Sequence, residues 1–473
     1  MVLSSVVFLL YFLPAFLFTY YLVGKRYKNL VILAFSIFFY AWGAPKFIFV
    51  ILATTFVDFH IVKWMSISPS VLQRKLLLTL SIFINVGLLV YFKYSNFFIE
   101  NLNWLLSLGG GPTIQWAKLL LPIGISFYTF ETVTYVVDVY RGIHKPLNKF
   151  WDYQTYIILF PKLIAGPIVR YHELADQITD RSQNDTIDNR LTGFYRFVLG
   201  LAKKVIIANH IGQQADTIFA MDYHTLNSYS AWIGILAYTF QIYFDFSGYS
   251  DMAIGIGKMI GFRFPENFNN PYISQSITEF WRRWHITLGN WMKNYLYIPL
   301  GGNRISVNRT YLNLWIVFLL SGLWHGASWN FVIWGAYNGT FLVLERLFLL
   351  KVYERIGRFF RTIITFFIVA VGWVFFRIEK FGDAILYLKK MFSFHTSHSI
   401  ELSSEFYTFF AIAAVFAFFA YLKTGQKIQD AIYFGQYTNN KHIRMTGLCV
   451  ILFILSLSFI TSTGFNPFIY YRF

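Results

Sequence analysis

The chain has 473 residues, of which 56% are hydrophobic and only 13% are charged. Soluble globular proteins carry roughly 25% charged residues because their surfaces face water, so this composition excludes a soluble fold. The net charge of +17 is carried by short Lys and Arg clusters between apolar runs. This pattern orients helices in a bilayer. It explains the basic charge without nucleic acid, which is not expected as a partner. The sequence therefore predicts an all-α polytopic membrane protein, with residues 1–473 forming one membrane-embedded domain.

The first apolar run, at about 4–24, is long enough to cross a hydrocarbon core of about 30 Å. No charged residue precedes this run, and the basic cluster Lys25–Lys28 follows it. A cleaved signal peptide has its basic residues in front of the apolar core, so we expect a retained membrane helix. Because basic loops stay in the cytoplasm, its amino terminus is expected to be extracytoplasmic.

Apolar runs that can cross a bilayer recur along the rest of the chain, and the basic loops Arg74–Lys75 and Arg141–Lys145 fit the same orientation. The run 228–262 is too long for one helix and is expected to break at Gly248. The run 310–344 has 35 residues without Asp, Glu, Lys or Arg, enough for two closely connected helices. The expected total is about eleven transmembrane helices. The runs lie at 29–43, 47–65, 76–92, 118–140, 153–169, 191–209, 228–262, 310–344, 361–376, 404–422 and 446–462.

The segment 264–304 does not fit a simple span. From Ile277 onward, apolar side chains recur at helical spacing, whereas charged residues lie off that stripe. This pattern predicts one amphipathic helix, either interfacial or re-entrant. The stripe consists of Ile277, Trp281, Trp284, Leu288, Trp291 and Tyr295, and the charged residues off it are Arg282, Arg283 and Lys293.

His325 is the first candidate for chemistry, because it lies inside the uncharged run 310–344. A titratable side chain at membrane depth is costly and usually faces the bundle interior or a wet cavity. Trp324, Trp329 and Trp334 can line a tunnel wall beside it. Ser321, Trp324 and Asn330 are therefore candidate substrate-binding residues. The alternative is a histidine that only links two helices by hydrogen bonds.

His285 is the second candidate, at the end of the Trp281–His285 segment. An imidazole can take a proton from a hydroxyl or hydrogen-bond to a developing oxyanion, and the residues leave both roles open. Four neighbouring basic residues can attract a phosphorylated donor at the cytoplasmic face, although anchoring at the membrane interface explains them equally well. These are Arg282, Arg283, Lys293 and Arg304.

Other polar motifs are weaker candidates for a catalytic or metal-binding role. Asp245, Ser247 and Asp251 can relay protons or bind an ion, but their spacing favours a hydrogen-bonded structural break. His395 and His398 lie in a polar loop without a nearby carboxylate or thiol, and the chain has one cysteine, so no metal site or disulfide is predicted. No G-x-S-x-G, P-loop or H-E-x-x-H motif occurs. Cofactor-binding residues are not identifiable.

Trp281–His285 and the later triplet Trp324–Gly326 resemble the membrane-bound O-acyltransferase (MBOAT) family, and the similarity runs over most of the chain. Five further segments resemble its bacterial alginate O-acetyltransferase branch. Proteins of peptidoglycan O-acetylation share these motifs, and relatives that incorporate D-alanine into teichoic acid are more distant. The five segments are Pro122–Phe130, Phe160–Pro167, Tyr243–Asp251, Tyr297–Gly302 and Phe468–Phe473.

The resemblance implies that His325 is the catalytic histidine and His285 the second one. It implies a ring of helices, thinned at its centre, with a cytoplasmic funnel leading to His325. It also implies acetyl-CoA as acyl donor without a permanently bound cofactor, and a multi-pass location in the bacterial inner membrane.

The expected function is O-acetylation of an exported polysaccharide, alginate or an alginate-like polymer. The expected partner is an extracytoplasmic acetyltransferase with a nucleophilic hydroxyl. Peptidoglycan O-acetylation is the alternative within the family. A secondary transporter is the alternative from another class, although transporters commonly show paired repeats and broken helices, which this sequence lacks. A scaffold that only recruits an enzyme would leave the histidines unused.

Overall fold

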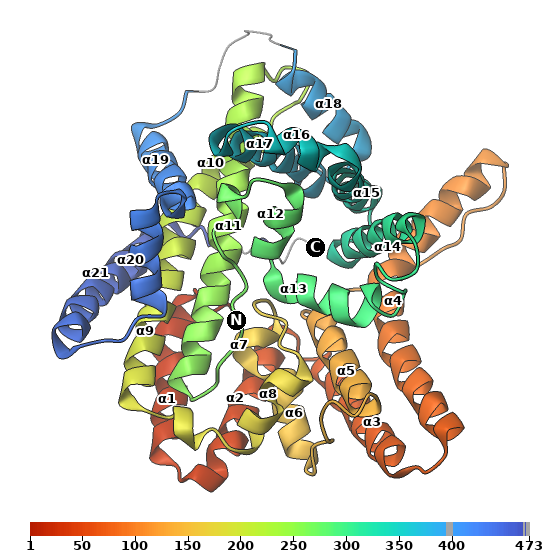
Figure 1. The fold of residues 1–473 in the computed structure, drawn as a ribbon, viewed down its shortest axis with the longest axis vertical. Helices are drawn as coiled ribbons and strands as arrows, with labels where there is room; N and C mark the ends of the chain where they lie inside the picture. The colour runs from red at the N-terminus through yellow and green to blue at the C-terminus, as the bar shows by residue number, and fades with distance from the viewer. Residues whose placement is uncertain (394–400, 467–468, 470–473) are drawn as a thin grey trace. The chain divides into compact units, whose positions relative to one another are not determined.

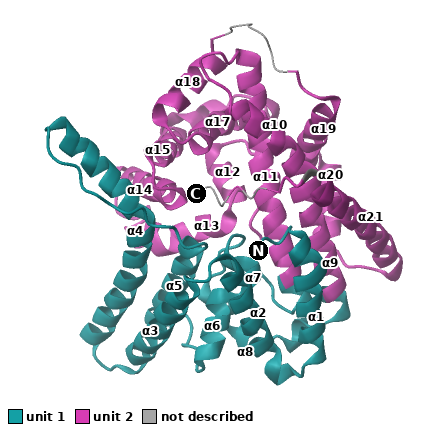
Figure 2. Cartoon of the chain, turned by 180° about the vertical axis from the view of Figure 1, so that it is seen from behind, with its two compact units in different colours: residues 1–189, 257–264 teal, residues 190–256, 265–473 magenta. Residues whose placement is uncertain are grey.

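The structure is a computed structural model that describes residues 1–393, 401–466 and 469, and within these ranges every regular element is a helix (Figure 1). The chain divides into two compact units. The first unit consists of residues 1–189 and 257–264, and the second of residues 190–256 and 265–473 (Figure 2).

The first unit contains mostly apolar helices with a few buried charges. Lys162 forms a fully buried ion pair with Glu131, and the Asp58 carboxylate accepts hydrogen bonds from Ser81 and Asn85. Each buried charge therefore has polar partners, which a low-dielectric interior demands. The helices are α1 (Leu13–Leu22), α2 (Lys28–Gly43), α3 (Ile48–Ile67), α4 (Val71–Leu108), α5 (Ile125–Tyr140), α6 (Phe150–Ile158), α7 (Phe160–Leu163) and α8 (Tyr171–Thr179), with the short turns Phe8–Phe12, Lys25–Tyr27 and Ser182–Asn184.

The expected span at 153–169 is not one helix. Helix α6 ends at Ile158, and α7 covers only Phe160–Leu163. Pro161 explains the interruption, because proline has no N–H to donate and its ring clashes with the carbonyl four residues earlier. The prediction of a single span over these residues is therefore wrong.

The second unit carries the two candidate histidines. Three of its helices continue directly into π-helical turns, at Lys203–Asn209, Met292–Tyr297 and Glu345–Leu349, and two 3₁₀ turns cover Pro271–Ile273 and Phe419–Tyr421. The helices are α9 (Ile187–Ala202), α10 (His210–Phe219), α11 (Ser228–Met259), α12 (Ile277–Arg283), α13 (Ile286–Trp291), α14 (Val307–His325), α15 (Trp329–Leu344), α16 (Leu350–Glu354), α17 (Arg358–Arg377), α18 (Phe381–Met391), α19 (Ser404–Phe418), α20 (Lys423–Tyr433) and α21 (Asn439–Thr463).

Among the described residues, five helices are long and apolar enough to cross a membrane. They are Ile48–Ile67, Val71–Leu108, Arg358–Arg377, Ser404–Tyr421 and Asn439–Ser462, and Phe8–Leu22 is a shorter apolar helix. These spans establish the multi-pass membrane character. The larger total of about eleven helices, their ring and the funnel stay predictions.

Helix α11 is continuous from Ser228 to Met259, so the break expected at Gly248, and with it the structural break around Asp245 and Asp251, is wrong. Gly248 instead allows close packing on α9. A Cβ atom at Gly248 would lie 2.7 Å from the carbonyl oxygen of Gly200, and a Cβ at Gly200 would lie 2.5 Å from that of Gly248. The two glycines are therefore needed for helix contact, not for a turn.

Ion pairs compensate the burial of two carboxylates in the apolar helix α11. Lys204 contacts Asp245 at 2.7 Å, and Asp251 pairs with both Arg196 and Lys203 at 2.6 Å. All five groups come from α9, its π-helical continuation and α11. We call this set the ion-pair region.

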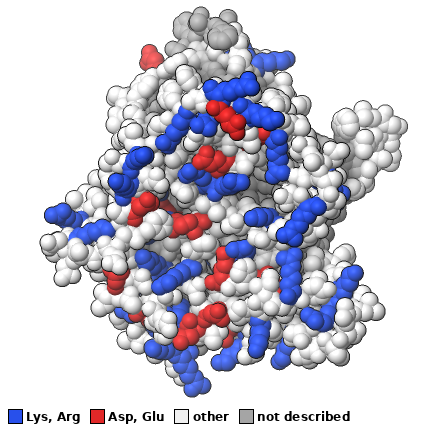
Figure 3. All heavy atoms as spheres, in the orientation of Figure 1, with Lys and Arg blue, Asp and Glu red and all other residues white. Residues whose placement is uncertain are grey.

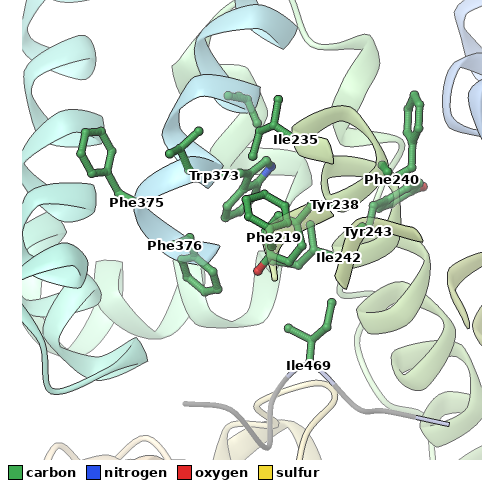
Figure 4. Close-up of a cluster of buried hydrophobic side chains, with 14 of the residues drawn as sticks. Phe219, Ile235, Tyr238, Phe240, Ile242, Tyr243, Trp373, Phe375, Phe376 and Ile469 are labelled. Atoms are coloured by element: carbon green, nitrogen blue, oxygen red, sulfur yellow. The ribbon is translucent and has the colours of Figure 1, made fainter. Parts of the chain in front are cut away.

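The apolar core of the second unit joins α11, α17 and a C-terminal residue (Figure 4). Tyr238 and Ile242 of α11 belong to the same buried cluster as Trp373 and Phe376 of α17. Ile469 joins this cluster, and its backbone N–H donates to Asp245 Oδ2 at 2.9 Å. Ile469 is therefore part of the core and is tied to the ion-pair region.

Candidate functional site

His325 is the last residue of α14, and the sequence around it explains why the helix ends there. Gly326 has extended backbone, and a Cβ at this position would lie only 2.0 Å from the ring of Phe331. Only glycine fits, so the chain turns at once into α15, which begins at Trp329. The uncharged run 310–344 thus forms two closely connected helices, as predicted, with His325 at the turn.

Aromatic rings surround the imidazole of His325, whose residue is 5% exposed. The ring centroids of Trp324, Trp334 and Phe376 lie 4.9, 5.2 and 5.1 Å from the imidazole centroid, all at steep angles. Trp324 and Trp334 therefore form a wall beside His325, as expected. Trp329, expected in the same wall, is 57% exposed.

The backbone breaks at His285, which corrects the prediction of one amphipathic helix from Ile277 onward. Helix α12 ends at Arg283, α13 starts at Ile286, and His285 has φ 44° and ψ 53°. This left-handed conformation is unfavourable for a residue with a Cβ and is retained only where surrounding contacts impose it. His285 is 1% exposed.

Asn267 supplies the contacts that hold His285. Its Oδ1 lies 3.1 Å from His285 Nδ1 and accepts hydrogen bonds from the Thr287 hydroxyl at 2.8 Å and the Thr287 backbone N–H at 3.3 Å. Its Nδ2 donates to Ser250 Oγ of α11 at 3.0 Å, and its backbone carbonyl accepts from the Ile286 N–H at 2.9 Å. Asn267 itself is completely buried.

Glu345 fixes the other end of the same segment. Its carboxylate accepts from the backbone N–H groups of Ile277 and Thr278, and from the Thr278 hydroxyl, at 2.5–2.9 Å. Ser276 Oγ caps the helix by accepting from the Glu279 N–H at 3.0 Å. A carboxylate at a helix N-terminus satisfies its free N–H groups and is favoured by the helix dipole, so α12 is held at both ends.

Trp324 connects the two histidines. Its ring centroid lies 6.1 Å from that of His285 and 4.9 Å from that of His325. Phe246 of α11 covers the His285 ring edge-on at 4.8 Å. Burial lowers the pKa of His285 to about 3, so its ring is neutral at physiological pH. The two histidines predicted from the sequence are therefore brought to one aromatic site.

The other predicted binding residues are distributed differently. Ser321 and Asn330 are 8% and 1% exposed, and the Asn330 amide donates to the backbone carbonyl of Ile378. Basic side chains are spread over the face of the molecule drawn in Figure 3. Of the four predicted for the donor, Arg282, Lys293 and Arg304 are exposed, whereas Arg283 pairs with Glu279 at 2.8 Å.

A cavity of about 350 Å³ lies beside the turn that follows His325. Gly326, Ala327 and Ser328 line it from the turn, and Phe376, which contacts the His325 ring, lines it from α17. Polar groups on its wall include Gln241, Arg377 and Glu379. The cavity thus has space for a small ligand, and Phe376 lies between it and the His325 ring, in contact with both.

Sequence reasoning missed Asn267, Glu345 and Phe376. Asn267 and Glu345 are polar residues 18 and 68 positions away from the partners they hold, and no spacing rule connects such pairs. Phe376 is one of many aromatic residues in its helix. His395 and His398, and all of the terminal Phe468–Phe473 segment except Ile469, lie outside the described residues.

Comparison with known proteins places these residues in a family. The model described as MBOAT, membrane-bound O-acyltransferase family, matches residues 147–373, which include both histidines and Trp324. The probable alginate O-acetylase of Pseudomonas aeruginosa is 46% identical over 85% of this chain and 77% of that protein. That of Azotobacter vinelandii is 41% identical over the whole of both chains, and the peptidoglycan O-acetyltransferase of Helicobacter pylori is 36% identical over 85% of this chain and 82% of that protein. The chain therefore belongs to the membrane-bound O-acyltransferase family and is an O-acyltransferase.

Proposed function

We propose that this O-acyltransferase supplies acetyl groups for O-acetylation of an exported polysaccharide, alginate or an alginate-like polymer. The observation that carries the proposal is the pair of buried histidines, His325 and His285, that contact one indole, Trp324. The names of the relatives at 46% and 41% identity support alginate as the polymer. Membership of an acyltransferase family leaves no support for a secondary transporter.

Acetyl-CoA is the proposed donor, and the bacterial inner membrane is the proposed location. Thioesters are activated acyl carriers of the cytoplasm, and the exposed Arg282, Lys293 and Arg304 suit the phosphates of such a donor. The basic loops Lys25–Lys28, Arg74–Lys75 and Arg141–Lys145 support a topology with these loops inside and the amino terminus outside.

In the proposed reaction, His325 takes the proton of an acceptor hydroxyl while the hydroxyl oxygen attacks the acetyl carbonyl carbon. A C–O ester bond forms and the C–S bond of the thioester breaks. The proton then passes from His325 to the departing thiolate, which leaves as a thiol. His285 positions or polarises the reacting groups. The reaction needs no redox step.

The proposed acceptor is a hydroxyl of an extracytoplasmic partner transferase, which passes the acetyl group to the polymer. The narrow surroundings of His325 support this relay. Its ring is enclosed by Trp324, Trp334 and Phe376 and its residue is 5% exposed, which leaves room for a single side chain more readily than for a polysaccharide strand.

Complementation tests the proposal. The chain is expressed in an alginate-producing bacterium whose own alginate O-acetylase has been deleted, and the acetyl ester content of exported alginate is measured by NMR. Wild-type protein should restore acetylation, and His325→Ala at equal membrane abundance should not. Equal restoration by His325→Ala, or absence of acetyl on every polymer despite normal abundance of the wild type, contradicts the proposal.

Peptidoglycan is the second candidate polymer, because the Helicobacter pylori relative is 36% identical over 85% of this chain. Mass spectrometry of muropeptides from the same cells separates the two polymers. Acetyl on muropeptides but not on alginate would replace the first candidate. Reconstitution in vesicles tests the relay, since efficient acetylation of alginate from acetyl-CoA without any partner protein would contradict it.

A further inference from the structure

The two roles open to His285 require opposite protonation states of the same nitrogen. A neutral imidazole has one N–H and one nitrogen with a lone pair. To stabilise an oxyanion, Nε2 must carry the proton and donate. To receive a hydrogen bond from a substrate, Nε2 must present its lone pair. The tautomer of His285 therefore decides what the residue can do.

The hydrogen bonds of Asn267 assign that tautomer. The Thr287 backbone N–H can only donate, so the Asn267 side-chain atom facing it is the oxygen Oδ1. The same oxygen faces His285 Nδ1 at 3.1 Å. Because an amide oxygen can only accept, Nδ1 must carry the proton. Nε2 then holds the lone pair.

His285 Nε2 is buried and has no hydrogen-bond partner within the part of the chain that the structure describes. Such buried unpaired acceptors are uncommon and call for an explanation. Of the two rings that contact the imidazole at 6.1 and 4.8 Å, Phe246 has no N–H or O–H, and the indole N–H of Trp324 makes no hydrogen bond to Nε2. A lone pair kept without a partner beside the catalytic candidate is suited to a ligand that brings its own donor.

We propose that Asn267 is the positioning residue that holds His285 in the Nδ1–H tautomer, so that His285 receives a hydrogen bond from a substrate at Nε2 and does not serve as an oxyanion donor. This inference rests on the proposed function. The acceptor hydroxyl has a single proton, which that reaction passes to His325. Acetyl-CoA carries further hydrogen-bond donors in its carrier arm, both amide N–H groups and a hydroxyl, and these suit the lone pair of Nε2, so His285 positions the thioester.

Within the described residues, the charged groups on the elements packed against His285 include none that is both buried and unpaired and would set its protonation in another way. Burial is the only cause behind its lowered pKa. The charged groups on the elements packed against it are paired or exposed, and the titratable neighbour beyond Trp324 is His325. The pairs are Asp245 with Lys204, Asp251 with Arg196 and Lys203, Glu266 with Arg196, and Glu279 with Arg283, while Arg282 and Lys293 are exposed.

The first test observes the tautomer in the wild-type protein. Full-length protein labelled with ¹⁵N-histidine in nanodiscs gives separate resonances for protonated and unprotonated ring nitrogens, and the His285 signals are identified by their loss in His285→Gln. We expect an unprotonated Nε2 and a protonated Nδ1 at neutral pH. A protonated Nε2 overturns the inference, even if acetyl transfer by His325 proceeds as proposed.

The second test uses Asn267→Asp, which keeps the acceptor at Nδ1 but adds a negative charge that raises the pKa of His285. As the pH falls, His285 gains a proton at Nε2 and loses its lone pair. The acetyl-transfer rate relative to wild type should therefore fall at low pH, about tenfold or more, with a raised KM for acetyl-CoA. An oxyanion donor would make the same ratio rise at low pH, and a purely structural Asn267 would make it independent of pH; either result overturns the inference.

Asn290→Asp is the matched control, because Asn290 is an exposed residue of α13. It adds the same charge to the same segment without the contact to His285. Its rate relative to wild type should be constant with pH. If Asn267→Asp fails to accumulate, Thr287→Val tests the same network. It removes the hydroxyl that binds Asn267 Oδ1 at 2.8 Å, and should raise the KM for acetyl-CoA more than it lowers kcat.

Discussion

Two regions of the second unit bury polar side chains in opposite ways. In the ion-pair region, Lys204 meets Asp245 at 2.7 Å, and Asp251 is shared by Arg196 and Lys203 at 2.6 Å. In the histidine region, defined by His325, His285 and the rings around them, the two imidazoles are in contact with aromatic rings.

The difference separates what holds the protein together from what performs chemistry. A buried charge that loses its partner is expensive, so the ion-pair region should determine stability. A substitution of a ring held among other rings leaves no buried charge unpaired, so its effect should appear in acetyl transfer more than in stability. Substitutions in the two regions should therefore affect different measurements.

The largest effect on activity is expected for His325→Ala. Loss of a general base costs about 10²–10⁴-fold in rate, while the thermal unfolding temperature should fall only as far as the small cavity left by the ring requires. The comparison is made on acetyl transfer per mole of folded protein. His224→Ala, at an exposed histidine of the same unit, should leave the rate unchanged. A variant that retains half of the activity would show that His325 is not the base.

The largest effect on stability is expected for Lys204→Met, which leaves Asp245 buried without its cation. Breaking a buried pair costs about 3–5 kcal/mol, measured as a fall in unfolding temperature or folded yield in detergent. Lys427→Met, at an exposed lysine, is the control. If Lys204→Met abolished acetyl transfer while unfolding at the wild-type temperature, the contrast between the two regions would be wrong.

Gly248→Ala should have a smaller effect on stability. The added Cβ would lie 2.7 Å from the carbonyl oxygen of Gly200, and overpacking of this kind costs about 1–3 kcal/mol. Gly447→Ala in α21 is the matched control, since its Cβ meets nothing within 4 Å. Thermal unfolding of the two variants should shift in opposite directions or by clearly different amounts; equal shifts would remove the case for close packing of α9 on α11.

The smallest effect is expected for Arg282→Gln in the exposed part of α12. A single exposed charge contributes little, so the KM for acetyl-CoA should rise at most about fivefold. The rise should vanish at high salt, because salt screens exposed charges, and Arg282→Lys should behave as wild type. A large fall in kcat would show that Arg282 takes part in the chemical step and does not merely attract the donor.

Much of the site could be predicted because its signals are local. The run 310–344 is uncharged, is long enough for two helices and has glycines around one histidine. These features together predict that His325 lies at the turn between α14 and α15. The tryptophans next to it were expected beside it for the same reason. Local sequence also identified the Trp281–His285 segment as unusual.

The break at His285 could not be predicted, because the apolar stripe from Ile277 to Tyr295 suits one helix as well as two short ones. What imposes the left-handed backbone is the contact with Asn267, 18 residues earlier, and that contact exists only in the folded unit. Local periodicity carries no information about such partners.

Gly248 shows the converse error. A glycine in a long apolar run predicts a break when the chain is considered alone. Its actual role depends on Gly200, which lies on another helix and brings the two backbones together. Likewise, the sequence around Asp245 and Asp251 favours a structural break, because it does not contain the cations that pair with these carboxylates in the folded unit. Those cations come from α9 and its continuation.

The hydrogen bond from the Ile469 backbone to Asp245 joins residues that are 224 positions apart. At translation speeds of about 5–20 residues per second, the ribosome needs roughly 11–45 s to synthesise the intervening chain. Throughout that interval the Asp245 carboxylate can rely on Lys204 but not on its second partner. Synthesis of α11 and closure of the core around Ile469 are therefore separate events in time, and the second unit stays unfinished for that interval.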